Sequence, residues 1–214
     1  KHLLGGVDPE DWRRQHKISS RFPGRMRVSF GLHPWWVAQH ENSECEEAMK
    51  ILDEMLHAYS KDHREDFRPW AIGETGLDFH ERFGSDTHER QIHFFGEHLS
   101  RACVLDLPLI LHVVRAHEPA LEVLEKVADE LKTRSTASRP SFRGIVHSFS
   151  GGLDVALRYR RLGFLLSVSA SVLTRGSGKA FDSLRSAVLS LEPNDFVLET
   201  DAPDQPPASQ KGQM

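Results

Sequence analysis

Four residues that can bind a metal ion each follow a short apolar segment of the chain. They are Glu74, His112, His147 and Asp201, which follow the segments 70–72, 109–111, 144–146 and 196–198. A buried parallel strand reads as a continuous apolar run, and in barrels of alternating strands and helices the chemistry gathers at the carboxyl ends of the strands. We therefore expect the four side chains to converge on one rim, as in a divalent-metal hydrolase.

Such a ligand set suits the hydrolysis of a phosphodiester. Two metal ions close together bind a non-bridging oxygen, lower the pKa of a shared water and stabilise the departing alkoxide. A single carboxylate such as Glu74 can bridge both ions. Each residue also has a structural interpretation: Glu74 can start a helix, His112 and His147 can be core histidines, and Asp201 can cap a helix or pair with an arginine. The residues alone leave these alternatives open.

Helical periodicity separates the candidate strands. Apolar residues recur at helical spacing within 48–59, 92–102, 121–131, 154–162 and 184–191. The predicted strands are Arg27–Gly31, Trp70–Gly73, Leu107–His112, Arg143–His147, Phe164–Val168 and Asp195–Glu199. About six strand–helix units in alternation favour a parallel sheet. The predicted fold class is therefore α/β.

Six units are too few for a closed eight-stranded barrel. We expect a (β/α)8 TIM barrel of the metal-dependent hydrolase type that is incomplete in this chain, with residues 1–214 forming one domain truncated at both ends. The start, Gly5–Pro9, reads as a loop. Two N-terminal strands and some C-terminal helix are expected to be missing.

Composition indicates a globular protein of the cytoplasm. Hydrophobic residues make up 39% of the chain and charged residues 27%, without an apolar run long enough for a membrane span. Cys45 and Cys103 are the two cysteines, which suits a reducing compartment. The formal net charge of −4 argues against extensive wrapping of duplex DNA. The net charge does not exclude a phosphate substrate held at a metal pair, because the ions supply local positive charge. The oligomeric state is left open, with a monomer as the simplest case.

With these residues identified, the chain resembles the TatD family of metal-dependent deoxyribonucleases, in the amidohydrolase-like barrel group. The motifs that carry the resemblance are, in chain order, Gly31–Pro34 (GLHP), Ile72–Asp78 (IGETGLD), Pro108–His112 (PLILH), Val146–Gly151 (VHSFSG) and Glu199–Pro203 (ETDAP). One of these motifs alone is a weak signal, whereas five in order are specific. The resemblance implies hydrolysis of DNA, in single strands or at ends, through a metal-activated water.

The resemblance also implies roles for individual residues. Glu74 matches a carboxylate that bridges two divalent ions, which are Mg²⁺, Mn²⁺ or Zn²⁺ in the complete protein. His112 and His147 match ligands of one ion, and Asp201 matches a ligand of the other. Glu74 and Asp201 are the expected catalytic residues, with Asp201 accepting a proton from the attacking water and Glu199 as its support.

The family places a His-x-His pair at the end of its first strand, and this sequence contains no His-x-His. One ion would therefore lose two ligands. We expect this chain to hold at most one ion well, to favour Zn²⁺ or Mn²⁺ there because of its imidazole ligands, and to be a poor or inactive nuclease.

The best candidates for holding the substrate phosphate are His33 and Arg115. Arginine offers a planar fork of donors that matches phosphate oxygens, although a surface ion pair is an equally good interpretation of Arg115. Trp35 and Trp36 follow His33 at a distance of two and three residues. Either can stack on a base or be buried against helices, and the sequence does not decide between the two.

Two other functions compete with the nuclease. A metal site of this type also polarises carbonyl groups, so an amidohydrolase acting on a small amide or ester is one alternative. The other is a non-catalytic fragment that lacks the metal ligands of the first strand.

Overall fold

The computed structural model describes residues 2–60, 69–134, 142–169, 172 and 178–201. The chain divides into two compact units, residues 1–127 and 128–214. Among the described helices, none combines the length and the apolar character that crossing a membrane requires. The single domain, the cytoplasmic location and the monomeric state stay predictions. Residues 202 and 203 of the last sequence motif lie outside the described ranges.

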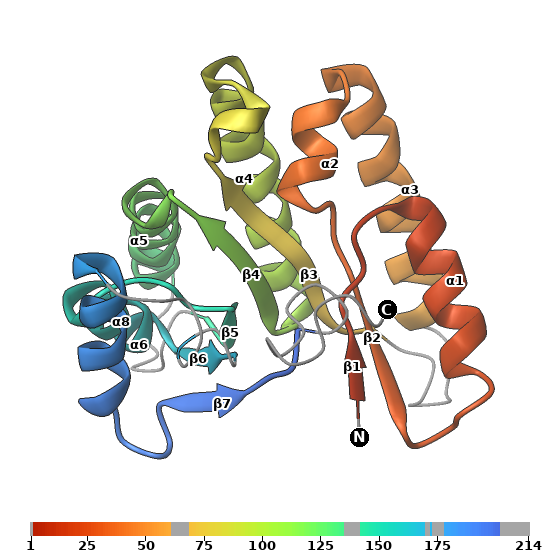
Figure 1. Ribbon diagram of the computed structural model, residues 1–214. Coiled ribbons are helices and arrows are strands. Elements are labelled where there is room, and N and C mark those ends of the chain that lie inside the picture. The colour runs from red at the N-terminus through yellow and green to blue at the C-terminus, as the bar shows by residue number, and fades with distance from the viewer. Residues whose placement is uncertain (1, 61–68, 135–141, 170–171, 173–177, 202–214) are drawn as a thin grey trace. The chain divides into compact units, whose positions relative to one another are not determined.

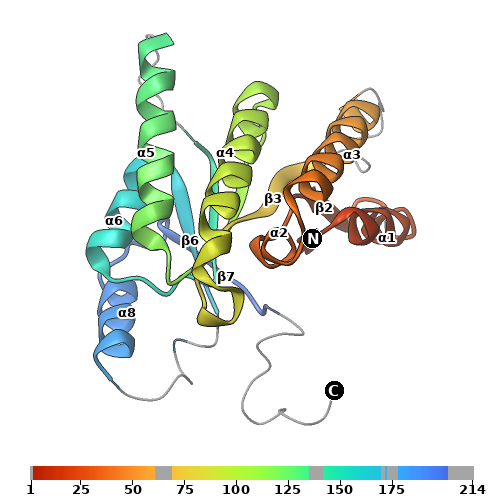
Figure 2. The ribbon, with the colours of Figure 1, turned by 90° about the horizontal axis from the view of Figure 1, so that it is seen from above.

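In the first unit, four strands pair in chain order and all described pairs are parallel (Figure 1). The strands are β1 (His2–Leu4), β2 (Met26–Phe30), β3 (Pro69–Asp78) and β4 (Leu109–Val114). The helices are α1 (Pro9–Ser19), α2 (Pro34–Gln39), α3 (Asn42–Ser60) and α4 (His88–Leu105), with two short 3-10 segments, η2 (Glu81–Phe83) and η3 (Ser85–Thr87), before α4; α5 (His117–Arg134) follows β4. Helix α1 packs against β2 and lies beside α3, and α4 packs against β3 (Figure 2).

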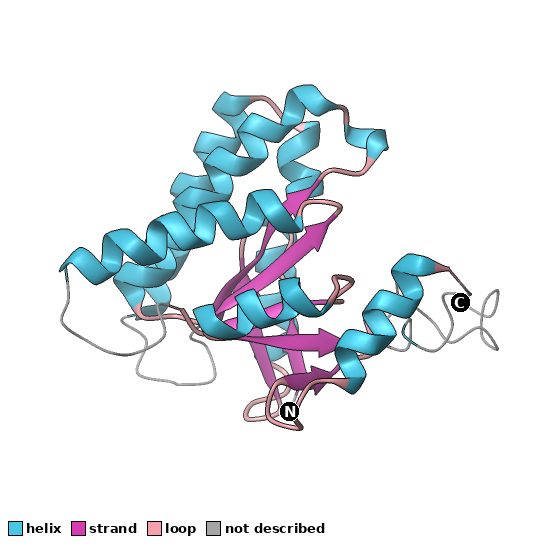
Figure 3. Ribbon diagram, turned by 90° about the vertical axis from the view of Figure 1, so that its left-hand side faces the viewer, coloured by secondary structure: helices cyan, strands magenta, loops and turns pink. Residues whose placement is uncertain are grey.

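The second unit repeats the pattern with three parallel strands. They are β5 (Gly144–His147), β6 (Phe164–Val168) and β7 (Phe196–Leu198), joined through α6 (Leu153–Leu162) and α8 (Lys179–Leu189). Helix α6 packs against both β6 and α8, and the helices lie in front of the strands in Figure 3. Gly163, with φ 101°, ends α6 in a left-handed cap, as its position after the periodic segment predicts.

The predicted α/β class is confirmed within each unit, since parallel strands alternate with helices. The helices predicted from apolar periodicity correspond to α3, α4, α5, α6 and α8. Strands β2, β4, β5, β6 and β7 lie within one or two residues of their predicted bounds.

The first strand and the first helix of the described chain are not among the elements that the sequence predicts. β1 is three residues long, too short for an alternating pattern to show. Helix α1 begins at the Asp8–Pro9 cap that was interpreted as loop, and Asp8 accepts hydrogen bonds from the backbone of Glu10 and Asp11. Its buried face contains Asp11, Trp12, Gln15 and Ser19, so no apolar stripe marks it. The chain therefore has seven strands in its described part, not the six predicted.

Strand β3 is longer than its predicted bounds of Trp70–Gly73. It continues to Asp78 because two glycines allow the chain to pass close to β4. Gly73 and Gly76 have φ of 143° and 141°, and a Cβ atom there would lie 2.5 Å from the Ile110 carbonyl oxygen and 2.1 Å from that of His112. Glu74 thus lies inside the strand, at a register shift between Ile72 and Thr75, and not at its end as expected.

A fully buried histidine ties α4 to the segment that follows β2. The Nδ1 atom of His98 contacts the carbonyl oxygen of Phe94 at 2.6 Å, and its Nε2 accepts the backbone N–H of Leu32 at 3.0 Å. Burial lowers the pKa of His98 to about 4. The ring is therefore neutral in the folded protein at neutral pH, which its role as an acceptor requires.

We expect His98 to make the protein sensitive to acid. Folding lowers the pKa of His98. The contribution of His98 to the free energy of unfolding is therefore fully present above the pKa of the unfolded chain, near 6.5, and is lost as the pH falls toward the folded-state pKa of about 4. Linkage predicts a loss of roughly 2 kcal/mol between pH 7.5 and pH 5. Urea unfolding at both pH values should show this loss in the wild type and a smaller one in His98→Gln. Equal pH dependence of the two proteins would contradict the prediction.

Candidate metal centre

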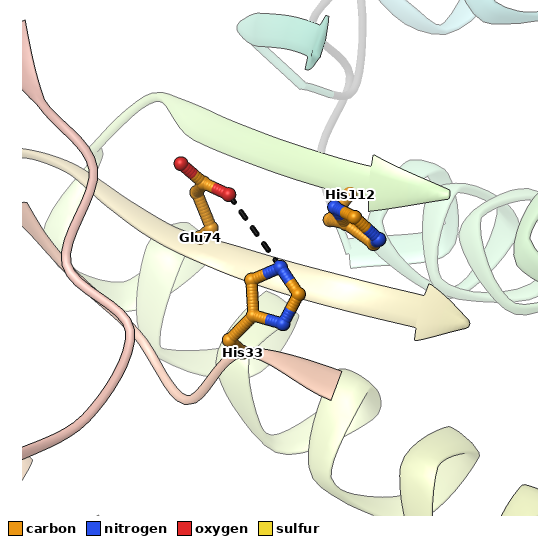
Figure 4. Close-up of side chains that lie close together, drawn as sticks. All are labelled: His33, Glu74 and His112. Atoms are coloured by element: carbon orange, nitrogen blue, oxygen red, sulfur yellow. Dashed lines mark ion pairs between the residues drawn. The ribbon is translucent and has the colours of Figure 1, made fainter. Parts of the chain in front are cut away.

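Three polar side chains of the first unit converge from three elements. His33 directly precedes α2, Glu74 lies in β3, and His112 lies in the neighbouring strand β4 (Figure 4). Each offers one ligand atom, and these atoms lie within 4.8 Å of one another. His33 Nε2 is 3.6 Å from Glu74 Oε2, and the rings of His33 and His112 are 4.3 Å apart between centroids. This group is largely shielded, since the His33 and Glu74 side chains are 4% and 20% exposed.

The hydrogen bonds of His33 determine which of its nitrogens carries a proton. Its Nδ1 caps α2 by accepting the backbone N–H of Trp35 at 3.1 Å. A ring that accepts at Nδ1 carries its proton on Nε2, and Nε2 faces the Glu74 carboxylate. His33 is therefore arranged as a hydrogen-bond donor rather than as a metal ligand. Its predicted contact with a substrate phosphate stays a prediction.

His112 is held by a buried carboxylate, Asp78, that is not among the predicted site residues. Its Nε2 lies 3.4 Å from Asp78 Oδ2, and Asp78 also accepts hydrogen bonds from the Trp35 indole and the backbone of His80. Burial alone would raise the pKa of Asp78, but the bonds from His112, His80 and Trp35 outweigh it and lower that pKa. A carboxylate on one nitrogen of a histidine orients the other nitrogen for a metal ion. The final Asp of the IGETGLD motif was the available signal.

Glu74 is positioned by the glycine segment that follows β1. Its backbone N–H donates to the Gly6 carbonyl oxygen at 2.8 Å. A Cβ atom on Gly5 would lie 2.1 Å from Glu74 Oε1, so the carboxylate occupies the space that any larger residue would fill. The same segment is fixed by the His33 N–H, which donates to Val7 at 3.0 Å, and by Gln15, whose amide donates to the Gly5 carbonyl at 2.6 Å.

The second unit contains its own group, formed by His147, Glu199 and Asp201. His147 Nδ1 lies 3.0 Å from Glu199 Oε2, and His147 Nε2 lies 3.4 Å from Asp201 Oδ1. Glu199 further accepts the Ser167 hydroxyl at 2.5 Å and the Ser148 N–H at 2.8 Å. Burial would raise the pKa of Glu199, but the bonds from His147, Ser167 and Ser148 lower it. Glu199 thereby orients His147, whereas the sequence predicted it as a support of Asp201.

The donor atoms of both groups suit a divalent ion. Two ligands about 2.0–2.2 Å from one tetrahedral ion lie roughly 3.4 Å apart, which is the separation of His147 Nε2 and Asp201 Oδ1. The mixture of imidazole and carboxylate suits Zn²⁺ and Mn²⁺. Asp201 and Ser148 have φ of 49° and 44°, a conformation uncommon outside glycine and concentrated at functional sites.

The grouping differs from the ligand set that the family pattern implies, in which His147 shares an ion with His112. His33, predicted to contact phosphate, lies with Glu74 and His112, whereas His147 lies with Asp201. Arg115, the other predicted phosphate contact, pairs with Glu81 at 2.5 Å in an exposed ion pair. The sharing of one ion by His112 and His147 stays a prediction.

Comparison with known proteins identifies the family. The family model described as TatD related DNase matches residues 1–214. The chain belongs to the TatD family. A relative from Escherichia coli (strain K12), the uncharacterized metal-dependent hydrolase YjjV, is 32% identical over 214 residues, which are 100% of this chain and 71% of that protein. The TatD membership confirms the predicted class of metal-dependent hydrolase.

Other TatD-like proteins extend the comparison. The 3'-5' ssDNA/RNA exonuclease TatD of Yersinia pseudotuberculosis is 25% identical over 201 residues, which are 94% of this chain and 67% of that protein. The crystal structure of YjjV, a TatD homolog from Escherichia coli, superposes with a TM-score of 0.73 at 28% identity, over 95% of this chain and 68% of that one. An uncharacterized amidohydrolase from Saccharomyces cerevisiae shares the fold, with a TM-score of 0.71 at 23% identity, over 96% of this chain and 65% of that one. The similarity to the YjjV structure confirms the predicted TIM-barrel type of fold.

Proposed function

We propose that the protein is a metal-dependent nuclease that hydrolyses phosphodiester bonds of DNA, in single strands or at their ends. The observation that carries the proposal is the group of the first unit, in which the Nε2–H of His33 faces Glu74 beside His112. A proton donor next to metal-binding groups suits a substrate that carries negative charge on its oxygens. Membership of the TatD family, and a relative named as an ssDNA/RNA exonuclease, support the same substrate class.

Glu74 and His112 would hold one ion, and His147 and Asp201 are the corresponding pair in the second unit. A bound divalent ion supplies positive charge that polarises the phosphoryl group and lowers the pKa of water. His33 is a donor and Glu199 is engaged in orienting His147, so each group retains two donor atoms where stable sites use about four ligands. We therefore keep the expectation that this chain holds at most one ion well.

The remaining roles belong to side chains. His33 donates a hydrogen bond from Nε2 to a phosphate oxygen. Arg115 offers its guanidinium to a second oxygen once the substrate competes with the exposed Glu81 for it. In the group of the second unit, Asp201 takes the proton of the attacking water as its oxygen bonds to phosphorus and the bond to the leaving oxygen breaks, and the leaving oxygen takes a proton from solvent. Glu74 and Asp201 are the proposed catalytic residues.

The proposal is tested with the purified chain, Mn²⁺, Mg²⁺ or Zn²⁺, and a panel of substrates. We expect turnover to be slow because the metal ligands are few, with single-stranded DNA cleaved faster than duplex DNA and small amides and lactones not cleaved at all. Strands labelled at either end report the polarity of cleavage. Hydrolysis of amides or lactones without cleavage of DNA would contradict the nuclease and favour an amidohydrolase. If the chain binds metal but hydrolyses none of these substrates, the result would favour a non-catalytic fragment.

A further inference from the structure

A small pocket of the first unit borders the group formed by His33, Glu74 and His112. It has a volume of about 280 Å³ and is lined by Trp35, Ala38, Gln39, Arg82 and Phe83. Two of these side chains are aromatic, one is cationic and one is an amide, and none of the five is acidic. Its volume lies near the lower end of small-molecule sites, which is enough for one planar ring system with its substituents.

Aromatic rings and a guanidinium line this pocket in contact with one another. The guanidinium carbon of Arg82 lies 4.7 Å from the centroid of the Trp35 ring and 4.5 Å from that of Phe83. The Arg82 side chain is 53% exposed, so its planar group is accessible from solvent. Aromatic faces and arginine planes are the surfaces on which single-stranded nucleic acids stack their bases.

Trp35 is fixed in orientation and joins the pocket to the candidate metal ligands. Its indole N–H donates to Asp78 at 2.5 Å, and its backbone N–H donates to His33. Its ring makes T-shaped contacts with His33, with centroids 4.4 Å apart, and with His112, with centroids 5.6 Å apart. A ring bound in the pocket is therefore separated from these histidines by a single side chain.

The neighbouring Trp36 is engaged differently. Its ring stacks on that of His40, with centroids 3.8 Å apart and an interplanar angle of 14°. The sequence left both tryptophans as equal candidates for stacking on a base, and the structure separates them. Trp36 lines a different depression, together with residues of α3, and serves as the matched control.

We propose that the pocket of Trp35, Arg82 and Phe83 binds the base of the nucleotide next to the bond that is cleaved. The inference rests on the proposed nuclease function and deepens it, because it assigns a base-binding subsite. The rings of Trp35 and Phe83 supply stacking surface, and the half-exposed Arg82 cation, 4.0 Å from Asp78, attracts the charged backbone of the strand. The amide of Gln39 offers both a donor and an acceptor to the edge of the base. Because stacking is sequence-tolerant, the subsite requires a base without selecting which one.

The test compares binding of a short oligothymidylate with that of an abasic strand of the same length. Both are labelled, and fluorescence anisotropy is measured in EDTA, so that the result does not depend on turnover or on bound metal. We expect wild type to bind the oligothymidylate more tightly than the abasic strand. Trp35→Leu should weaken oligothymidylate binding about tenfold and leave the abasic strand unaffected. Trp35→Phe, which keeps an aromatic ring, should lose less affinity for the oligothymidylate, and Trp36→Leu should bind it as the wild type does.

Two further variants test the subsite even if Trp35→Leu does not fold. Phe83→Leu removes the second ring, and Arg82→Lys keeps the charge but loses the plane. Both should reduce the preference for bases. Equal affinity of wild type for the two strands would overturn the subsite, as would an unchanged preference in Trp35→Leu and Phe83→Leu. A wild-type chain that prefers bases but cleaves no DNA keeps the subsite and removes the nuclease function, whereas cleavage without base preference does the reverse.

Discussion

Glu74→Gln and Glu74→Ala are each expected to abolish hydrolysis while the protein remains folded. The Glu74 carboxylate is the only acidic group in the cluster with His33 and His112 among the described residues, and glutamine removes its charge without changing its shape. Removing a residue that only hydrogen-bonds to a metal ligand lowers metal affinity or activity by roughly 10–100-fold. For Glu74, a proposed ligand, we therefore expect activity to fall by more than about 100-fold. The same result is expected for Asp201→Ala, since Asp201 is the proposed proton acceptor. Turnover of DNA at saturating Mn²⁺ measures the effect.

Glu47→Gln is the matched control for the loss of a carboxylate. Glu47 lies on α3 and forms an exposed ion pair with Lys50 at 3.1 Å, an interaction that contributes little to stability. The activity and melting temperature of Glu47→Gln should equal those of the wild type. Calorimetric titration with Zn²⁺ provides a second readout for Glu74→Gln that needs no turnover. Wild-type turnover together with wild-type metal affinity in Glu74→Gln would remove this residue from the site.

Gly5→Ala is expected to damage function far more than stability. The new Cβ atom would lie 2.1 Å from Glu74 Oε1 and 3.0 Å from its Cδ, so one of the two must move. The backbone of this segment is fixed, because Gln15 bonds the Gly5 carbonyl and the Glu74 N–H bonds the Gly6 carbonyl. The carboxylate, at the end of a flexible side chain, therefore gives way. We expect metal affinity and turnover to fall by about tenfold or more.

Gly96→Ala is the control for Gly5→Ala. Gly96 lies in α4, and outside the backbone of its own helix and its chain neighbours no atom lies within 4 Å of the position its Cβ would take. Alanine there should stabilise the helix by about 0.5–1 kcal/mol without changing metal affinity. Thermal melts and metal titrations of both variants separate the two effects. If Gly5→Ala binds metal and turns over DNA as the wild type does, the segment after β1 does not position Glu74.

The fold class follows from local patterns that the sequence displays directly. Apolar segments and helical periodicity depend on neighbours within a few residues, and they predicted α3 to α6 and α8 and most strands closely. The same patterns failed at β1 and α1. β1 is too short to show alternation, and the buried face of α1 is largely polar, with Asp11 and Gln15 buried beside Trp12. Cap chemistry at Asp8–Pro9 was the signal that could have revealed the helix.

By itself, the sequence determined which residues offer metal-binding atoms, because Glu74, His112, His147 and Asp201 are marked by residue type and by the apolar segments before them. Only the tertiary structure decided which side chains touch. In the structure, His33 lies close to Glu74 and Asp78 contacts His112. Gly5 leaves space for the Glu74 carboxylate, and Trp35 contacts both histidines and lines a pocket. Apart from the contact of Trp35 with His33, these contacts join residues 34 to 77 positions apart. They depend on the register of β3 against its neighbours, which shifts at Ile72–Thr75. No local pattern encodes that register, because it is set by the packing of whole strands.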